Sequence, residues 1–231
     1  MRYLSTALAI LVSAFIFSCT SNEVGNSSDV NPETVYFDYK ISGEEGNNDI
    51  TVMLQYRFAG KNGTTLLLDS SSKVELDGER LKADSSKYTG AFYEIQKPVD
   101  AFAGKHTITY TDISGKTYTE EFEFRPISLL ADVPETLTRG DLQFEIGGLA
   151  ATDYVHVMMT DTAFGSNGLS RVDTVKDGRL VIKKADLKGL VNGPVAFELA
   201  REEERPVKNG TSEGGRILIS YRLKKDFLLK D

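Results

Sequence analysis

The feature that most constrains the fold of this chain is a period-two pattern, in which apolar side chains recur at every second position of short stretches. The clearest stretch is Asp49–Phe58, where one side carries Ile50, Val52, Leu54, Tyr56 and Phe58. A strand places successive side chains on opposite faces, so the pattern is typical of a β-strand with one buried and one solvated face. Turn-forming residues separate the stretches, which favours strands joined by short connections.

Two series of strands are expected from this pattern. The first comprises 35–41, 49–58, 64–69, 73–82, 88–96, 105–112 and 117–125. The stretch 73–82 is expected to be a hairpin, because Asp77 and Gly78 suit the two positive φ angles of a type I′ turn. The second series comprises 127–131, 142–146, 153–161, 171–175, 179–182, 194–201 and 216–223. One helical turn is expected at 184–190 and a long polar loop at 205–215.

Arg125 and Pro126 mark the expected joint between the two series. The residue before a proline avoids helical geometry, and proline cannot pair within a central strand. The predicted domains are therefore 34–126 and 127–231, each with about seven short strands, a number typical of a β-sandwich. The predicted fold class is all-β, with two tandem antiparallel β-sandwiches. A single large β-barrel is the alternative, and the pattern does not fix the strand order.

The end of the first series carries a resemblance to a known type of module. Residues 104–112, GKHTITYTD, followed by Gly115, are similar to the final hairpin of many bacterial immunoglobulin-like domains. The resemblance implies that the sandwiches are immunoglobulin-like. Many β-sandwich families share this sequence pattern, so it indicates no specific family.

The first 18 residues have the composition of a secretory signal peptide. Arg2 provides a positive charge, residues 7–17 form a short apolar core, and small Ser18 precedes the only cysteine of the chain, Cys19. The apolar core is shorter than the roughly 20 residues that a membrane-spanning helix needs.

Ile16-Phe17-Ser18-Cys19 resembles the lipobox of bacterial lipoproteins, with Ile16 and Ser18 at matching positions and Phe17 larger than is usual. The resemblance implies that the thiol of Cys19 receives a diacylglycerol, that the signal is cleaved after Ser18, and that the new amino group is acylated. Thr20 replaces the aspartate that retains some lipoproteins in the inner membrane. The resemblance therefore implies an outer-membrane lipoprotein facing the periplasm or the cell surface. An ordinary signal peptide or an uncleaved anchor is the alternative.

Residues 19–33 are expected to link the lipid to the first domain. The stretch 21–33, SNEVGNSSDVNPE, is rich in serine, asparagine and acidic residues and has few apolar ones. Such a composition cannot bury a core, so it predicts a flexible tether.

Composition excludes several classes of function. The formal net charge of −7 argues against non-specific nucleic-acid binding, which needs a basic surface. If Cys19 is lipidated, no thiol remains for a disulfide, a zinc-thiolate site or a cysteine nucleophile. The absence of tryptophan makes an aromatic sugar-binding platform less expected. No cofactor is indicated.

No catalytic or metal-binding constellation emerges from the pattern. His106 and His156, the only histidines, fall in different strands, and alternation places His156 on the face of Tyr154 and Met158. The acidic runs 44–45, 120–121 and 202–204 are expected on solvated faces or turns. Weaker patterns are a calcium-like set, Asn47-Asn48-Asp49 and Asp161, and two stretches that resemble O-glycan acceptors, Asp161-Thr162-Ala163 and Asp173-Thr174-Val175.

The expected function is therefore a non-catalytic binding, adhesion or accessory module anchored in the envelope through Cys19. Its expected partner, besides the membrane, is an envelope protein or a glycan. Two alternatives stay open: a carbohydrate-active or other hydrolytic enzyme with a carboxylate site, and a purely structural spacer.

Overall fold

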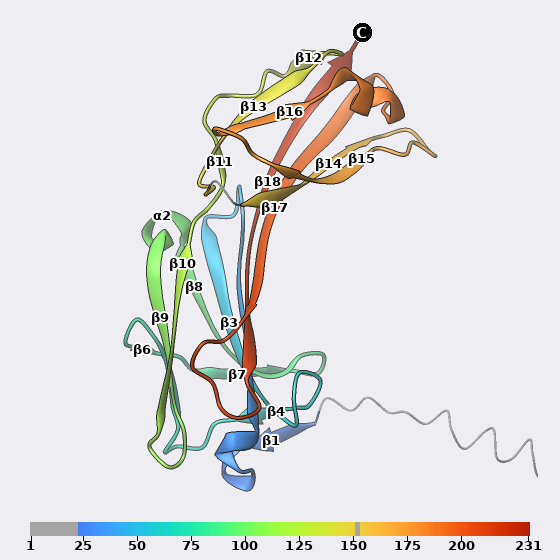
Figure 1. Ribbon diagram of the computed structural model, residues 1–231. Helices are drawn as coiled ribbons and strands as arrows, with labels where there is room; N and C mark the ends of the chain where they lie inside the picture. The colour runs from blue at the N-terminus through green and yellow to red at the C-terminus, as the bar shows by residue number, and fades with distance from the viewer. Residues whose placement is uncertain (1–22, 151–152) are drawn as a thin grey trace, which may run out of the picture.

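A computed structural model describes residues 23–150 and 153–231. Nearly all the regular structure is β-strand, and the strands form two β-sandwiches placed end to end along an elongated molecule (Figure 1). The predicted all-β class with two tandem sandwiches is confirmed. No helix in the described ranges is long and apolar enough to cross a membrane.

The first sandwich packs two sheets around an aromatic core. One sheet is centred on β3 (Asp49–Phe58), which pairs with β2 (Val35–Glu44), β4 (Thr64–Leu67) and β8 (Gly90–Pro98), and β8 pairs with β7 (Ala83–Ser86). The other sheet has the order β10 (Thr117–Phe124), β9 (Gly104–Thr111), β5 (Lys73–Leu76), β6 (Glu79–Arg80). The short helix α2 (Val99–Phe102) connects β8 to β9. Between the sheets, the rings of Tyr56 and Tyr110 stack with centroids 4.4 Å apart.

The second sandwich pairs a larger with a smaller sheet. The larger contains β14 (Tyr154–Asp161), β15 (Leu169–Thr174), β17 (Gly193–Pro206), β18 (Gly215–Lys230) and β12 (Thr136–Thr138). The smaller has the order β11 (Ser128–Leu129), β13 (Leu142–Gly147), β16 (Arg179–Ile182). The two sheets meet at the stacked rings of Phe144 and Phe197, 4.5 Å apart. The 3-10 helix η3 (Lys184–Gly189) occupies the stretch where a helical turn was expected.

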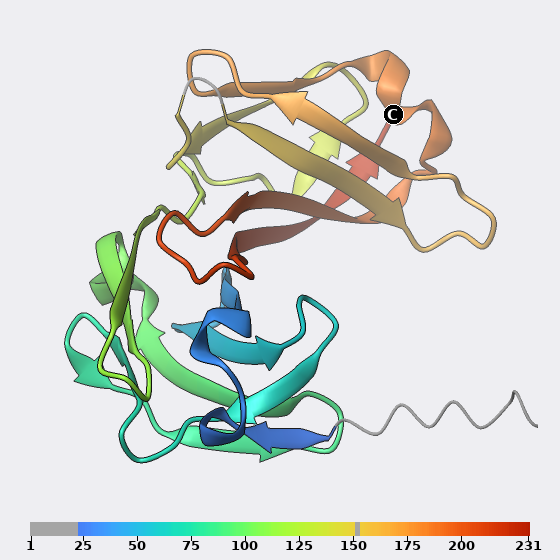
Figure 2. The ribbon, with the colours of Figure 1, turned by 60° about the horizontal axis from the view of Figure 1, so that its bottom comes forward.

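The β17–β18 hairpin runs through both sandwiches (Figures 1 and 2). Its strands pair continuously from Gly193↔Leu229 to Pro206↔Arg216. Within the first sandwich, β18 pairs in parallel with β2 from Gly215↔Phe37 to Arg222↔Glu44. Within the second, its last residues pair in parallel with β12. One sheet is therefore continuous through the molecule, and the hairpin belongs to both predicted domains although a boundary at 126 assigns it to the second alone.

The expected flexible tether is wrong for residues 24–33. Val24–Asn26 forms β1, which pairs in parallel with β4, and two 3-10 helices follow, η1 (Ser27–Asp29) and η2 (Pro32–Thr34). Ser27 is buried and its Oγ accepts a hydrogen bond from the backbone N–H of Asp69 at 2.8 Å. Short polar side chains here satisfy backbone groups of the first sandwich, a role that composition alone does not reveal.

The local turn and strand predictions hold where the pattern was strongest. Asp77 and Gly78 both adopt positive φ, at 52° and 84°, as the type I′ hairpin requires. The last hairpin of the first series is present as β9 and β10, paired from Thr111↔Thr117 onward. The polar loop predicted at 205–215 is shorter, because β17 continues to Pro206 and β18 begins at Gly215.

Candidate functional site

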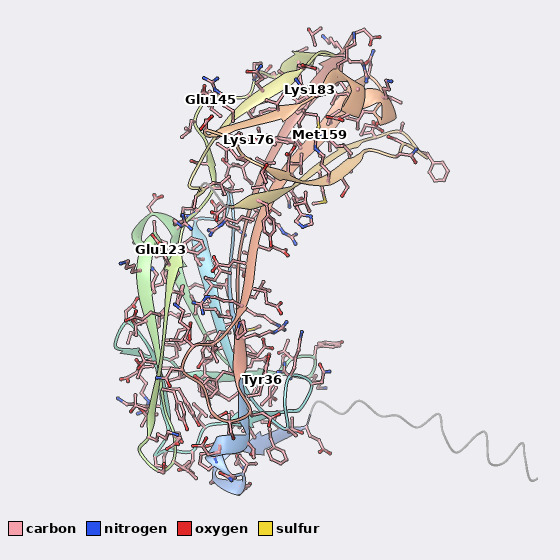
Figure 3. The ribbon with its side chains drawn as sticks, viewed as in Figure 1. Tyr36, Glu123, Glu145, Met159, Lys176 and Lys183 are labelled. Atoms are coloured by element: carbon pink, nitrogen blue, oxygen red, sulfur yellow. The ribbon has the colours of Figure 1, made fainter. Side chains whose placement is uncertain are left out.

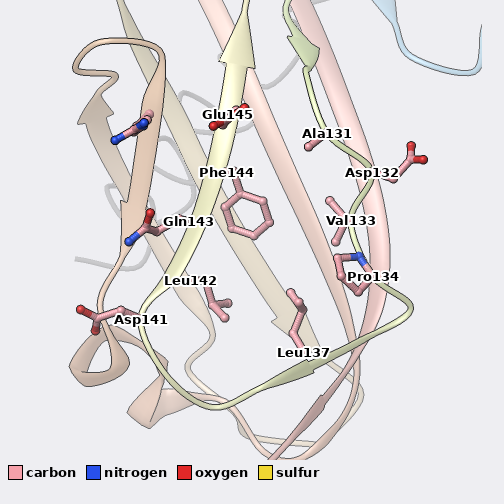
Figure 4. Close-up of a pocket in the computed structure, with 11 residues that line it drawn as sticks. Ala131, Asp132, Val133, Pro134, Leu137, Asp141, Leu142, Gln143, Phe144 and Glu145 are labelled. Carbon is pink, nitrogen blue, oxygen red and sulfur yellow. The ribbon is translucent and has the colours of Figure 1, made fainter.

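An open groove in the second sandwich combines a concave shape with apolar and charged side chains. It has a volume of about 530 Å³ and lies between β13 and the segment 131–137 (Figure 4). Its apolar lining consists of Val133, Pro134, Leu137, Leu142 and Phe144, and its charged lining of Asp132, Asp141, Glu145 and Arg179. The volume falls within the range of small-ligand and peptide-side-chain pockets.

The groove exists because the chain changes sheets beside β13. β11 pairs with β13 only at Gly147 and Ile146, and Leu130 N–H still donates to Glu145 O at 2.8 Å. The chain then crosses to the other sheet, where β12 pairs with β18. Over Asp141–Phe144, no strand of the described chain pairs with β13 on the side away from β16.

The ladder geometry leaves a backbone amide of β13 facing this groove. Ile146 N–H donates to Gly178 O on the β16 side. In an antiparallel ladder the hydrogen-bonded positions alternate, so Phe144 and Leu142 also bond toward β16, and Gln143 directs its N–H and C=O the other way. The groove thus combines apolar side chains from Leu142 and Phe144 with an unpaired strand edge.

The rim of the groove is acidic. Asp141 accepts hydrogen bonds from the backbone N–H of Lys184 at 2.9 Å and from Lys183 Nζ at 3.0 Å, and these contacts lower the pKa of its carboxyl group. Asp132 and Glu145 have no ion-pair partner within the described chain, and Glu145 points outward from the second sandwich (Figure 3). Two carboxylates at the rim are therefore available to a cationic partner.

Cys19 and Ser18, the predicted lipidation and cleavage residues, lie outside the described residues, so their roles stay predictions. The described chain begins at the end of the first sandwich that lies far from the second sandwich (Figure 1).

The two histidines lie in different sandwiches. His106 is held in the first: Nδ1 lies 2.7 Å from Asp77 Oδ2, Nε2 lies 2.7 Å from Phe102 O, and its ring stacks on Phe102 at 3.8 Å. Both nitrogens are engaged, so His106 has no nitrogen available as a general base. His156 is exposed on β14, on the face of Tyr154 as predicted and opposite buried Val155 and Val157.

A second cavity, of about 460 Å³, brings His106 together with members of two predicted acidic runs, Glu121 and Glu203. Lys105, Arg205 and Lys208 share its lining, so the cavity is lined by both positive and negative charges. Sequence reasoning did not anticipate this grouping, because Glu203 and Arg205 come from β17 and Lys208 from the loop after it, whereas the other residues come from β9 and β10.

Four other acids of the predicted runs are engaged in ion pairs. Glu44 pairs with Lys224 at 2.7 Å, Glu45 with Lys225 at 3.1 Å, Glu120 with Arg205 at 2.5 Å and Glu204 with Arg216 at 3.1 Å. They lie on different strands rather than facing each other across one cleft. The described residues contain no group of three or more His, Cys, Asp or Glu side chains arranged to hold a metal.

The weaker sequence patterns resolve into local roles. Asp161 accepts hydrogen bonds from Ser166 Oγ, Val191 N–H and Ala163 N–H, which lower the pKa of its carboxyl group and fix the β14–β15 loop. Thr162 and Thr174, the hydroxyl residues of the acceptor-like stretches, are both exposed.

The groove residues themselves were missed at the level of sequence. Each is an ordinary strand or loop residue, and the segment 131–137 shows no motif. The available signal was Pro134, which interrupts the strand pattern between the first two stretches of the second series.

Comparisons with known proteins identify no family. No protein-family model and no curated protein matches the chain. Among solved structures, a fragment of the titin I-band matches at 11 % identity and TM-score 0.29, covering 82 % of this chain and 65 % of that one. SGBP-B of the Bacteroides ovatus mixed-linkage glucan utilization locus, in complex with a mixed-linkage heptasaccharide, matches at 10 % identity and TM-score 0.22, covering 90 % and 65 %.

The Yersinia pseudotuberculosis adhesin InvE matches at 10 % identity and TM-score 0.23, covering 83 % of this chain and 59 % of the adhesin. This chain spans less than two thirds of the length of each of these three structures. At these TM-scores the matches carry no functional inference, and the fold assignment rests on the sheets themselves.

Proposed function

We propose that this chain is an outer-membrane lipoprotein, anchored through Cys19, that acts as a non-catalytic binding module. The observation that carries the proposal is the position of the two ends. The lipobox-like cysteine precedes the described chain by a few residues, and the groove lies in the sandwich at the opposite end of the molecule (Figure 1). An anchored copy would therefore present the groove away from its own membrane.

Residues 24–33, which pack on the first sandwich, limit how far this sandwich can lie from the anchor. Because β1 begins at Val24, the five residues from Cys19 to Val24 can span at most roughly 18 Å. The first sandwich would then stand close to the lipid headgroups, and the second would project from it.

Two features of the groove support a binding role for it. Val133, Pro134 and Leu137, the apolar lining residues that stay partly exposed, gain free energy when an apolar group covers them, at about 25 cal/mol for each Å² removed from water. The backbone N–H and C=O of Gln143 face the groove and would select a partner by the direction of its hydrogen bonds. The acidic rim would select a partner by its charge.

A hydrolytic enzyme is the second candidate, and the cavity around His106, Glu121 and Glu203 is its best location. Against it, both nitrogens of His106 are engaged and basic side chains share the cavity. A pair of carboxylates that works as acid and base needs separate environments and a substrate cleft between them. If the chain is instead a purely structural spacer, substitutions in the groove should leave its binding to envelope proteins and glycans unchanged.

The anchor is tested by replacing Cys19 with alanine in the native host. The variant should leave the membrane fraction and lose incorporation of labelled palmitate, while its folded domains resist protease as before. Unchanged fractionation without lipid label would contradict the anchor.

The binding role is tested with the variant Ala131→Arg, which places a long cation at the groove, against Ala185→Arg on η3 as a matched surface control. In pull-downs from solubilised envelope, Ala131→Arg should lose proteins or glycans that wild type and Ala185→Arg retain. Identical profiles for all three chains would favour the spacer.

A further inference from the structure

The β14–β15 loop, residues 162–168, exposes an aromatic ring completely. The side chain of Phe164 is fully solvent-exposed, whereas most large apolar residues within the described ranges are buried. Its neighbours are small, Ala163 and Gly165, and a Cβ built on Gly165 would meet no atom within 4 Å. The ring therefore stands alone at the tip of a slender loop, a shape suited to a concave partner rather than to a flat one.

This loop is held in place rather than left loose. Asp161 Oδ2 accepts from Ser166 Oγ at 2.7 Å and from Val191 N–H at 2.8 Å, and Ser166 Oγ lies 2.8 Å from Gly189 O. These bonds tie the loop to η3 and to the residues after it. A ring presented by an ordered loop loses less conformational entropy on binding than one on a mobile loop.

The surroundings of Phe164 complement the groove in chemistry. Val191, which is bonded to Asp161, is also exposed, and Lys188, on the neighbouring η3, is exposed with no ion-pair partner in the described chain. The groove offers partly exposed Val133, Pro134 and Leu137 over the buried side chains of Leu142 and Phe144. Asp132 and Glu145 are unpaired at its rim within the described chain. The loop therefore carries an apolar tip and has a cation near its base, where Ser166 bonds to Gly189, and these features would complement an apolar groove with anions at its rim on another molecule.

We infer that the Phe164 loop of one copy of this chain inserts into the groove of a second copy, between β13 and the segment 131–137. The loop and the groove lie on different sides of the second sandwich (Figures 1 and 2), so the contact is heterologous and links copies head to tail. The contact itself does not depend on the anchor or on any other partner.

The inference is tested by cross-linking purified full chains in which Cys19 is replaced by serine. One chain carries Asn167→Cys on the loop, and the other, with a different tag, carries Glu135→Cys beside the groove; both positions are exposed. With a short bismaleimide, mixing the two should yield the dimer between differently tagged chains, and a chain with both cysteines should yield a ladder of oligomers.

Adding Phe164→Ser to the loop chain should lower the cross-link yield at least about tenfold, as for the loss of an aromatic anchor. Tyr88→Ser, at an exposed tyrosine of the first sandwich, is the matched control and should leave the yield unchanged. Because Phe164 is fully exposed, its replacement should not change the unfolding curve.

Three outcomes would overturn the inference: no cross-link at any concentration, equal yields with and without Phe164, or preferential linkage of loop to loop. Binding of the chain to phosphatidylethanolamine–phosphatidylglycerol vesicles that requires Phe164, without cross-linking, would assign the tip to a lipid surface and would also overturn it. Failure here leaves the fractionation and pull-down tests of the proposed function unaffected.

Discussion

At the scale of single residues, the first sandwich contains charges that are almost completely removed from water. Glu120 on β10 is 2 % exposed and accepts hydrogen bonds from Arg205 Nη1 at 2.5 Å and from the backbone N–H of Lys208 at 2.6 Å. Removing one partner of a buried pair leaves an uncompensated charge, which is more costly than replacing both partners. These contacts tie β10 to the β17–β18 hairpin.

Arg205→Met should therefore destabilise the protein by about 3–5 kcal/mol, since Glu120 stays buried without its cation. The matched control is Arg222→Met, because the Arg222 side chain is 51 % exposed and its contact with Glu198 Oε1 is long, at 3.8 Å. That change should cost about 0–1 kcal/mol. Urea unfolding followed by circular dichroism measures both, and equal losses would contradict the assignment of Glu120 as a buried partner.

Glu33 gives the protein a defined response to acid. Hydrogen bonds from Lys116 and from the backbone N–H of Ser212 hold the pKa of Glu33 below its ordinary value of 4.5. Its stabilising contribution is complete above pH 4.5 and is lost as the pH falls through the lower pKa of the folded state. Wild type should lose more stability than Glu33→Gln between pH 5 and the acid limit, as measured by unfolding at a series of pH values. Parallel curves for the two chains would be the contrary result.

The sequence predicted the position of a side chain only where that position follows from the alternation of side chains along one strand. His156 lies on the exposed face with Tyr154 because alternation along β14 decides it. The partners of His106 could not be predicted, since Asp77 sits in a distant turn and Phe102 in α2, and only the folded packing brings them to one ring.

At the scale of elements, strands were predictable and their connections less so. Alternating stretches such as Asp49–Phe58 became strands because burial of one face outweighs every local alternative. The segment 24–33 was mispredicted because hydrogen bonds to β4 and to the loop before β18 stabilise it. Such bonds require no pattern of apolar residues that the sequence could show. The groove was equally invisible, since it arises from a crossing of the chain between sheets.

The turn between β3 and β4 depends on Gly63. A Cβ on Gly63 would lie 1.7 Å from Phe58 O, a backbone atom that cannot rotate away. Gly63→Ala should therefore cost about 3 kcal/mol or more, at the upper end of overpacking changes. Gly46→Ala is the control: its φ is +88° but open space surrounds it, so only backbone strain of about 1–2 kcal/mol is expected. Thermal unfolding of the two variants should rank them in this order, and the reverse ranking would show that the turn relaxes.

At the scale of the whole molecule, the two sandwiches are joined by more than a linker. The β17–β18 hairpin supplies strands to both, and at the junction Arg201 lies 3.3 Å from Asp153 Oδ2 and donates to Arg125 O at 3.3 Å. Arg125 itself lies 3.6 Å from the same carboxylate. The local signal at Pro126 revealed where one series of strands ends. It could not reveal that a hairpin far along the chain returns to complete the first sheet, since pairing between distant strands is not encoded in their periods.

This architecture predicts one fixed orientation between the sandwiches. In a Cys19→Ser background, spin labels at Lys61→Cys on the first sandwich and Lys176→Cys on the second should give a narrow distance distribution by pulsed electron resonance. Two labels within the first sandwich, at Lys61→Cys and Lys105→Cys, provide the reference width. A distribution several times broader between sandwiches than within one would show a flexible joint.

The parallel pairing of β2 with β18 also decides how the molecule bears mechanical load. If the N-terminal end is held at a surface and the distal sandwich is pulled, β2 is drawn one way and β18 the other along their common axis. The backbone bonds from Phe37↔Gly215 to Glu44↔Arg222 then lie across the force and are loaded together in shear, rather than broken one after another. A chain built in this way resists extension until the whole ladder yields at once.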